Sequence, residues 1–209
     1  MSDFDLVLRQ GSVHDGSGGD PWIGDVAVSA DCIVEMAPRL AGTGRQELDA
    51  TSCAITPGFI NMMSWGVETL IEDGRSMSDV MQGVTLEVMG EGASMGPLNP
   101  QMRHEMERGG LDGDIEGYRY PVEWTTLCGY LDWLERRGVS PNIASFVGAG
   151  TLRVHEAGHA DRPLSVPELA RMCTLLDDEM RHGALGVASA LIYPPETAYL
   201  TTELVTLAS

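Results

Sequence analysis

Basic residues are scarce in this sequence. Only 13 lysines and arginines stand against 31 acidic residues, which gives a formal net charge of -18. A field of this sign repels phosphate backbones and anionic membrane surfaces. We therefore expect neither nucleic acid nor a membrane as a partner. The simplest interpretation of the excess charge is a hydrated acidic surface that favours solubility.

Cysteine is also rare, and no two cysteines lie close together in the chain. This spacing excludes zinc knuckles and redox Cys-X-X-Cys motifs. Scattered thiols at apolar positions fit simple core packing in a reducing compartment. The four residues are Cys32, Cys53, Cys128 and Cys173.

Several sequence features of other protein classes are missing. No apolar run approaches the roughly 20 residues needed to span a bilayer, and the opening MSDFDLVLRQ has neither the basic nor the apolar region of a signal peptide. We therefore expect a cytoplasmic location. The glycines of residues 16–19 precede no helix. A nucleotide-binding function is thus weakly supported.

Residues 1–53 alternate apolar and polar side chains in the manner of strands. Asp5–Arg9, Asp25–Val28 and Cys32–Met36 show this pattern, and the turn-rich stretches DGSGGDP and SADC divide them. We predict a small antiparallel β-module over this range.

Residues 54–209 alternate between apolar runs and helical patterns. The expected buried strands each end in a polar or glycine-rich corner, as parallel strands do: Ala54–Ile60, Val84–Met89, Asn142–Val147 and Leu185–Ala190. Between them lie two capping boxes, at residues 76–79 and 165–168, and an amphipathic helix that begins near Leu127 and stops at Gly138. The pattern predicts an α/β fold with about four β/α units.

This alternation is typical of a β/α-barrel, but a barrel alone needs about 250 residues. A chain of 209 residues falls short of that length. We therefore expect residues 54–209 to form the N-terminal part of a barrel, with chemistry at the carboxyl ends of its strands. The long irregular region 91–123 would lie over that edge as a lid.

Polar residues at the strand ends are the candidates for function. Glu91, between two glycines, is suited to metal ligation or general acid-base chemistry, although a hydrated loop carboxylate is the alternative. Ser64 follows the first strand and is a candidate for substrate binding. Arg153 has the geometry to bind a substrate carboxylate in bidentate fashion, or else forms a structural ion pair. His155 and His159 are spaced as metal ligands on a helix, but Gly158 favours a loop there.

Several motifs resemble the amidohydrolase superfamily, and within it the D-aminoacylase (N-acyl-D-amino-acid deacylase) group. They are DLVLRQGSVHDGSG, TPGFI, QGVT with its glycine-rich corner, YLDWLERRG, NIASFVGAGTLR and GALGVASALIYPPETAY. The resemblance covers nearly the whole chain. It implies a metal-dependent TIM-barrel hydrolase whose β-module is completed by strands from the C-terminal end. It also implies a substrate-facing role for Tyr193, for which packing on Pro194 is the alternative.

One motif departs from this family. Its members follow PGFI with Asp, one residue, and a His-X-His pair that binds zinc, but Met63 and Trp65 stand at the histidine positions here. A thioether is a weak zinc ligand and an indole is none. At the position of the family's metal-binding cysteine this chain has Gly92. The resemblance implies zinc, while these residues support it only weakly and leave Glu91 as the candidate metal ligand.

The resemblance implies hydrolysis of the amide C–N bond of an N-acylated amino acid or a related small amide. We expect the 209-residue chain by itself to be inactive, with the remaining catalytic residues in a longer chain. One alternative is a pseudoenzyme or small-molecule binding protein that kept the fold and lost the metal. Another is assembly of the partial barrel with itself or a partner through open sheet edges.

Overall fold

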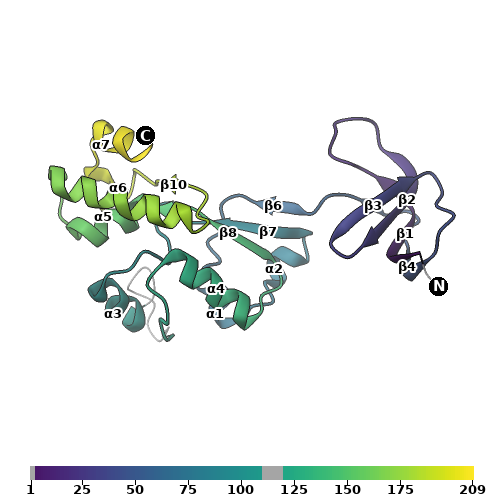
Figure 1. Cartoon of the computed structure of the whole chain (residues 1–209), viewed down its shortest axis with the longest axis horizontal. Helices are drawn as coiled ribbons and strands as arrows, with labels where there is room; N and C mark the ends of the chain where they lie inside the picture. The colour runs from purple at the N-terminus through teal and green to yellow at the C-terminus, as the bar shows by residue number, and fades with distance from the viewer. Residues whose placement is uncertain (1–2, 110–119) are drawn as a thin grey trace. The chain divides into compact units, whose positions relative to one another are not determined.

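The computed structural model describes residues 3–109 and 120–209. The chain divides into two compact units, Met1–Gly58 and Phe59–Ser209 (Figure 1).

A single sheet makes up the first unit. Its strands are β1 (Phe4–Val13), β2 (Trp22–Ser29), β3 (Cys32–Ala37), β4 (Gly44–Asp49) and β5 (Ala54–Ile55). β2 pairs antiparallel with both β1 and β3, whereas β4 and β5 run parallel to β1. The module is therefore mixed and not purely antiparallel as expected. The reason is that residues 38–43 carry the chain back across the sheet, so that β4 starts beside the beginning of β1.

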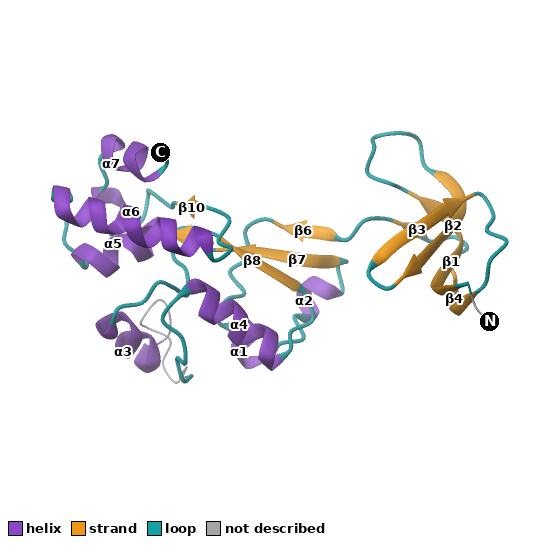
Figure 2. Ribbon diagram, in the orientation of Figure 1, coloured by secondary structure: helices purple, strands orange, loops and turns teal. Residues whose placement is uncertain are grey.

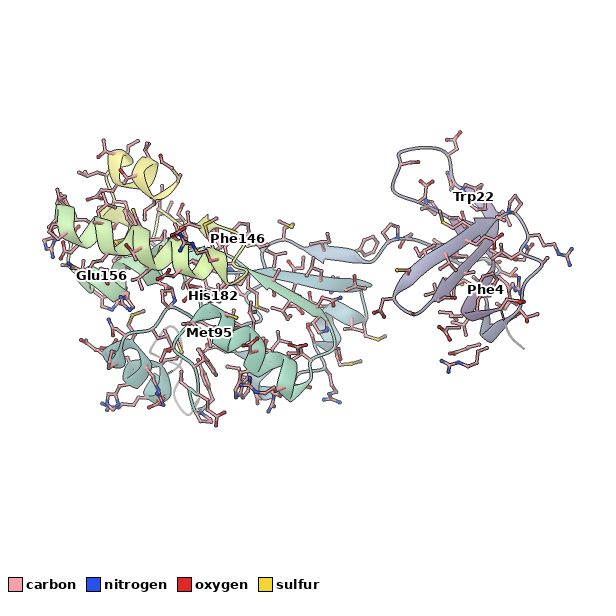
Figure 3. The ribbon with its side chains drawn as sticks, in the orientation of Figure 1. Phe4, Trp22, Met95, Phe146, Glu156 and His182 are labelled. Carbon is pink, nitrogen blue, oxygen red and sulfur yellow. The ribbon has the colours of Figure 1, made fainter. Side chains whose placement is uncertain are left out.

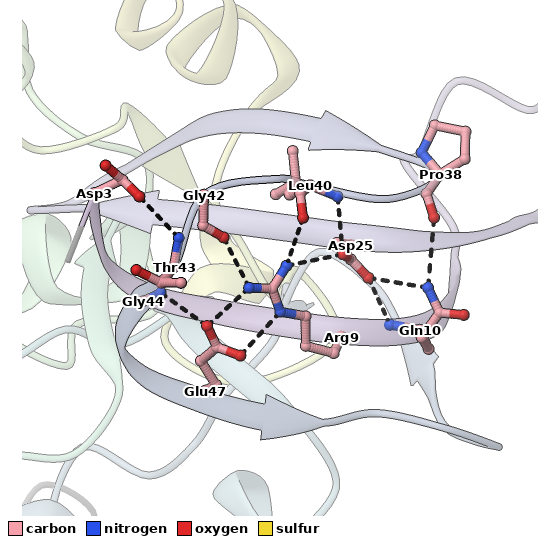
Figure 4. A network of polar contacts seen from close by, with 10 residues as sticks. All are labelled: Asp3, Arg9, Gln10, Asp25, Pro38, Leu40, Gly42, Thr43, Gly44 and Glu47. Atoms are coloured by element: carbon pink, nitrogen blue, oxygen red, sulfur yellow. Dashed lines mark hydrogen bonds and ion pairs between the residues drawn. The ribbon is translucent and has the colours of Figure 1, made fainter.

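Arg9 lies at the centre of a polar network in this sheet (Figure 4). Its guanidinium donates to Asp25 at 3.0 Å, to Glu47 at 2.7 Å and to two backbone carbonyls. The buried Asp25 also accepts from the backbone N–H groups of Gln10 and Leu40. Burial opposes ionisation of Asp25, but these donors outweigh it and hold its pKa at about 2. The network joins β1, β2 and β4 to the connection between β3 and β4.

The second unit is built on short parallel strands (Figure 2). β6 (Phe59–Asn61), β7 (Val84–Met89) and β8 (Asn142–Ser145) form one sheet in that order, and β9 (Val147–Gly148) pairs with β10 (Val187–Ala188). Phe146, labelled in Figure 3, alone separates β8 from β9. Its N–H donates to the Met89 carbonyl at 2.8 Å. All these strands run in one direction, so their carboxyl ends share one edge.

The strand predictions hold for β7 and need correction elsewhere. The expected strand Ala54–Ile60 is divided between the two units as β5 and β6, because Pro57 has no N–H to donate to a ladder and Gly58 follows it. It is also not buried, since Phe59 and Ile60 are exposed. The strand Asn142–Val147 is broken at Phe146, and Leu185–Ala190 shortens to β10.

Helices follow the strands in sequence. They are α1 (Thr69–Glu72), α2 (Met77–Val80), α3 (Pro100–Gly109), α4 (Leu127–Arg137), α5 (Ala149–Ala157), α6 (Val166–Arg181), the 3₁₀ turn η1 (Glu196–Ala198) and α7 (Thr201–Leu207). The predicted helix before Gly138 is confirmed as α4, with Leu127, Tyr130 and Leu134 on its buried face. α3 and residues 120–123 belong to the predicted lid, whereas residues 110–119 of that lid lie outside the described residues.

The two predicted capping boxes have different outcomes. At α6, Glu168 accepts the Ser165 N–H at 2.7 Å, as expected. At α2, Ser76 has a φ of 43° and its hydroxyl donates to Glu87 instead of capping the helix. The apolar spacing of Leu169, Met172, Leu176 and Met180 predicts Met180 on the buried face of α6. Met180 is instead exposed, and Glu179 lies on that face.

The core of the second unit lies between its strands and helices. Its fully buried members include Met89, Val147, Leu152 and Met172. Trp124 packs against Tyr130 and donates its indole N–H to the Met95 carbonyl at 2.7 Å. Within the described residues, the structure has no helix of the length and apolarity that crossing a membrane requires.

Candidate functional site

The carboxyl ends of the parallel strands define the candidate site. We call it the strand-end rim, and it comprises residues 61–65 after β6, 90–93 after β7, 148–151 after β9 and 189–196 after β10. In parallel α/β folds this edge positions catalytic and binding groups, because the loops that follow successive strands converge there.

Ser64 anchors the corner after β6. Its N–H donates to the Val88 carbonyl at 2.9 Å, and its hydroxyl donates to Oε2 of Glu87 at 2.6 Å. The other Glu87 oxygen accepts from the Ser76 hydroxyl at 2.6 Å. Both Ser64 and Glu87 are buried. The Ser64 hydroxyl is therefore directed at the protein, and substrate binding by this residue stays a prediction.

Apolar side chains occupy the rest of this corner. Met63 is 59% exposed and Trp65 is 51% exposed, and Met62 beside them is also exposed. These residues place a thioether, an indole and a second thioether at the end of β6. Such groups give an apolar surface and supply no hard donor to a metal ion.

The corner after β7 is held by backbone and hydroxyl contacts to the start of α5. The Gly92 carbonyl accepts the Gly150 N–H at 2.8 Å, and Thr151 Oγ1 accepts the Ser94 N–H at 2.8 Å. Glu91, the predicted metal ligand, is half-buried between Gly90 and Gly92. Metal ligation by Glu91 stays a prediction.

Glu196 is the buried carboxylate of the rim. It begins η1, and its Oε2 accepts the Ala190 N–H at 2.9 Å. Burial raises the pKa of Glu196 above its usual value, and the negative charge of Glu91 adds to this effect, while the N–H groups of Ala190 and Gly150 oppose it. Two carboxylates thus lie close enough to interact, one half-buried and one almost fully buried.

Tyr193 and Arg153 differ in accessibility. Tyr193 is 61% exposed, and its carbonyl accepts the Glu196 N–H at 2.9 Å, so the turn that holds Glu196 also presents Tyr193. Arg153 is fully buried in α5, donates to the Ala160 and Arg162 carbonyls, and lies over the Tyr199 ring. Among the described residues its Nε and Nη1 have no hydrogen-bond partner. Substrate binding by Arg153 and Tyr193 stays a prediction.

The structure therefore brings Glu91 near a residue that sequence reasoning did not select. Glu196 lies in the motif YPPETAY, in which the resemblance implies a role for Tyr193 only. The available signal is an acidic residue directly after Pro194 and Pro195, in the connection that follows β10. Glu87 was missed because a glutamate inside an apolar strand carries no sign of its serine partners.

His155 and His159 do not form the predicted pair of metal ligands on one helix. His155 lies in α5 and contacts Glu156 at 2.9 Å, while Gly158 ends the helix before His159 is reached. The two histidines therefore do not share a helix. Across residues 3–109 and 120–209, no group of three or more His, Cys, Asp and Glu side chains is placed to hold a metal ion.

Comparison with known proteins gives a consistent result. No family model matches the chain. N-acyl-D-aspartate deacylase of Alcaligenes xylosoxydans xylosoxydans is 31% identical over 205 residues, covering 96% of this chain and 39% of the relative. D-aminoacylase of the same organism is 30% identical over 203 residues, covering 97% of this chain and 41% of the relative. The chain thus spans about two fifths of the length of these relatives.

The fold agrees with the sequence comparison. A solved structure of D-aminoacylase, studied for the role of its binuclear metal centre, superposes with a TM-score of 0.87 at 28% identity and covers 98% of this chain and 42% of that one. The sequence likeness covers 96% of the chain and the shared fold covers 98%, so both include residues of both units. The chain is therefore homologous to D-aminoacylase and related N-acyl-D-amino-acid deacylases, and it corresponds to a part of these amidohydrolases.

Proposed function

We propose that the protein carrying this chain hydrolyses the amide C–N bond of N-acylated amino acids. The observation that carries this proposal is the match of both units to deacylases, at 31% identity to N-acyl-D-aspartate deacylase over 96% of the chain. In such a reaction water adds to the acyl carbon, the C–N bond breaks, and a carboxylic acid and an amine are released. The substrate class is a small N-acylated amino acid or a related amide.

The strand-end rim supplies one side of the proposed site. We place residues 59–209 as the first part of a β/α-barrel, with about four β/α units. Tyr193 is an exposed polar side chain of the rim and is proposed to contact substrate. Glu91 and Glu196 are proposed as its acidic groups. Burial favours the protonated form of Glu196, so the pair holds a proton more readily than two hydrated carboxylates would.

The metal of the relatives does not fit the residues present here. The rim offers the thioether of Met63, the indole of Trp65 and no side chain at Gly92, and the described residues contain no other cluster of metal donors. Glu91 alone is not a binding site for zinc, which takes four ligands from Cys, His and carboxylate groups. We therefore assign no step of the reaction to a metal held by this part of the chain.

A binding protein without catalysis is the second candidate function. The exposed Met62, Met63 and Trp65 favour it, because they form an apolar surface at the end of β6, where the family resemblance implies metal ligands. Methionine-rich surfaces adapt to apolar ligands. On this view the acyl group of the ligand would contact the corner after β6.

Both candidates are tested with the full-length protein that carries this chain. It is incubated with N-acetyl-D-amino acids and their L-enantiomers, and amine release is measured with and without a chelator. Release of amine supports the hydrolase. Saturable binding in calorimetry without turnover supports the binding protein, and neither turnover nor binding contradicts both.

The role of Tyr193 is tested in the same assay. Tyr193→Ala is expected to raise KM or Kd about tenfold, which corresponds to one lost contact of about 1.4 kcal/mol. Ile192→Ala is the matched control, since the neighbouring Ile192 is also exposed. Equal effects of the two substitutions would remove Tyr193 from the site.

A further inference from the structure

Gly92 lies where the chain leaves little room for a side chain. Its φ is 71°, in the left-handed region, and a Cβ added there would lie 2.8 Å from Glu196 Oε1 and 2.9 Å from the Ala190 Cβ. Real Cβ atoms do not approach neighbours so closely. The carboxylate of Glu196 therefore fills the space into which a side chain at position 92 would project.

Gly150 bounds the same space from the other side. A Cβ added at Gly150 would lie 3.0 Å from Glu196 Oε1 and 2.8 Å from the Gly92 carbonyl. The two glycines come from the ends of β7 and β9, and the Gly150 N–H donates to the Gly92 carbonyl. Together they form a cradle that accommodates a carboxylate only because both lack side chains.

Glu196 reaches this cradle from a third strand end. Its Oε2 accepts the N–H of Ala190, two residues after β10, and its own N–H donates to the Tyr193 carbonyl. It is 4% exposed. One side chain therefore contacts the corners that follow β7, β9 and β10, and it holds the turn that presents Tyr193.

We propose that Glu196 is the positioning residue of the strand-end rim, and that its carboxylate takes the place of a side chain at position 92 so that this corner binds no metal ion. Residues 92, 150 and 196 then share one space. A side chain at position 92 and the carboxylate at position 196 cannot both occupy it. This inference does not rest on the proposed function, because it concerns how the rim is filled and not what it hydrolyses.

A double-mutant cycle in the full-length protein tests the shared space. Gly92→Ala is expected to raise the unfolding equilibrium constant about tenfold more than Gly138→Ala does, and Glu196→Ala is expected to abolish most of that excess. Gly138 is the matched control, because its φ is 82° and no described atom lies within 4 Å of a Cβ added there. Both glycines have a positive φ, and comparing Gly92→Ala with and without Glu196→Ala isolates the contact with Glu196. Unfolding is followed by urea titration.

Glu196→Gln tests whether the volume of the side chain at position 196, and not its charge, opposes a side chain at position 92. The glutamine side chain fills the same space, so Gly92→Ala should stay as harmful in that background as in the wild type. If Glu196 only supplies hydrogen bonds to the fold, the losses in free energy of unfolding caused by Gly92→Ala and Glu196→Ala should add in the double variant. Additivity would therefore overturn the proposal.

Metal content provides a second measurement that does not depend on activity. The zinc, manganese and nickel contents of the full-length protein, measured by elemental analysis, should be the same for the wild type and for Glu196→Ala. A fall in bound metal in that variant would show that Glu196 is a ligand, and would overturn the proposal. If the full-length protein shows no deacylation, but its metal content is unchanged in Glu196→Ala and the Gly92→Ala and Glu196→Ala effects are not additive, then the proposed function is contradicted and this inference is not.

Discussion

Asp25, Glu87 and Glu196 are each removed from solvent, and each accepts hydrogen bonds from groups fixed by the fold. Their surroundings differ in one respect. Asp25 faces the cationic Arg9, whereas Glu87 faces hydroxyl groups and Glu196 faces a backbone N–H and a second carboxylate. A buried carboxylate therefore contributes differently to stability at each of these three positions.

Acid should destabilise the first unit through Asp25. The folded pKa of about 2 lies below the usual 3.8, so ionised Asp25 stabilises the fold above the usual value and this contribution is lost as pH falls toward 2. The full contribution is about 2 kcal/mol. Asp25→Asn should lower the free energy of unfolding by about that amount at pH 7, measured by urea titration with circular dichroism.

The control for this prediction is Asp20→Asn, which changes an exposed carboxylate by the same chemistry. The difference between wild type and Asp25→Asn should narrow as pH falls from 5 to 3. A difference that stays constant over this range would show that Asp25 acts by packing and not by its charge.

Glu87 should control the order of the corner after β6. Glu87→Ala leaves the hydroxyls of Ser64 and Ser76 without their acceptor and should cost about 2 kcal/mol. Hydrogen exchange of residues 61–67, measured by mass spectrometry, should accelerate in this variant. Glu72→Gln, at an exposed position on α1, should leave that exchange unchanged. If both variants exchange at the wild-type rate, Ser64 does not need Glu87 to hold the corner.

At the scale of helices, one buried acidic side chain links two of them. Glu179 of α6 accepts the N–H of Leu127, the first residue of α4, at 3.0 Å. Burial raises the pKa of Glu179 above 4.5, although the N–H groups of Leu127 and Cys128 favour the charged form. The protonated form therefore stabilises the fold fully below pH 4.5, and this contribution is lost as pH rises through the raised folded pKa.

Glu179→Ala should lower the free energy of unfolding by about 1–2 kcal/mol, because the first turn of α4 loses its acceptor. Glu179→Gln keeps one acceptor and does not ionise, so the wild type should lose stability relative to it as pH rises from 4.5. Thermal unfolding at a series of pH values measures both effects. Asp161→Asn, at an exposed position outside α6, is the control. A wild type that gains stability relative to Glu179→Gln on raising the pH would contradict this assignment.

Elements with strong local signals were predictable from the sequence. α4 follows from its apolar spacing and Gly138, the start of α6 from the Ser165–Glu168 capping box, and β7 from a β-branched run between glycines. Where tertiary contacts decide, local reasoning was wrong. Ser76 caps no helix because Glu87 takes its hydroxyl, and Met180 is exposed because Glu179 faces the start of α4.

The sequence predicted where in the fold the candidate site lies, but it did not predict all of the residues that form the site. Parallel strand ends predicted the rim, and Glu91 does lie there. Glu196 was not predicted, because its burial depends on the absence of side chains at Gly92 and Gly150, which are distant from it in sequence. A sequence pattern records residue types at fixed spacings, whereas the cradle forms only when three strand ends meet.

At the scale of the whole chain, the described residues hold no cluster of metal donors, and the rim contains the ends of only part of a barrel. We therefore expect the 209-residue chain, expressed alone, to release no amine from N-acetyl-D-amino acids. Amine release that disappears on chelation would contradict this expectation, since it would require a metal site that these residues do not form.

Self-association of the expressed chain follows from the open edge of its second sheet. β6 pairs only with β7 among the described strands, and Ile60 on β6 is 55% exposed. An unpaired strand with apolar side chains is a template for pairing with another chain. We expect the 209-residue chain to sediment as dimers and larger species at micromolar concentration, despite a net charge of -18 that opposes contact.

Ile60→Lys should shift the chain toward the monomer, because a lysine on an edge strand disfavours edge pairing. Val166→Lys makes the same change of charge at a residue that is 83% exposed at the start of α6, away from any strand, and should leave the distribution unchanged. Sedimentation velocity compares the three proteins at equal concentration. If the two lysine variants dissociate equally, the effect is one of net charge. If the wild type is already a monodisperse monomer, the edge of β6 is not an association surface, and the exposed Ile60 must be tolerated in water as isolated surface apolar residues are.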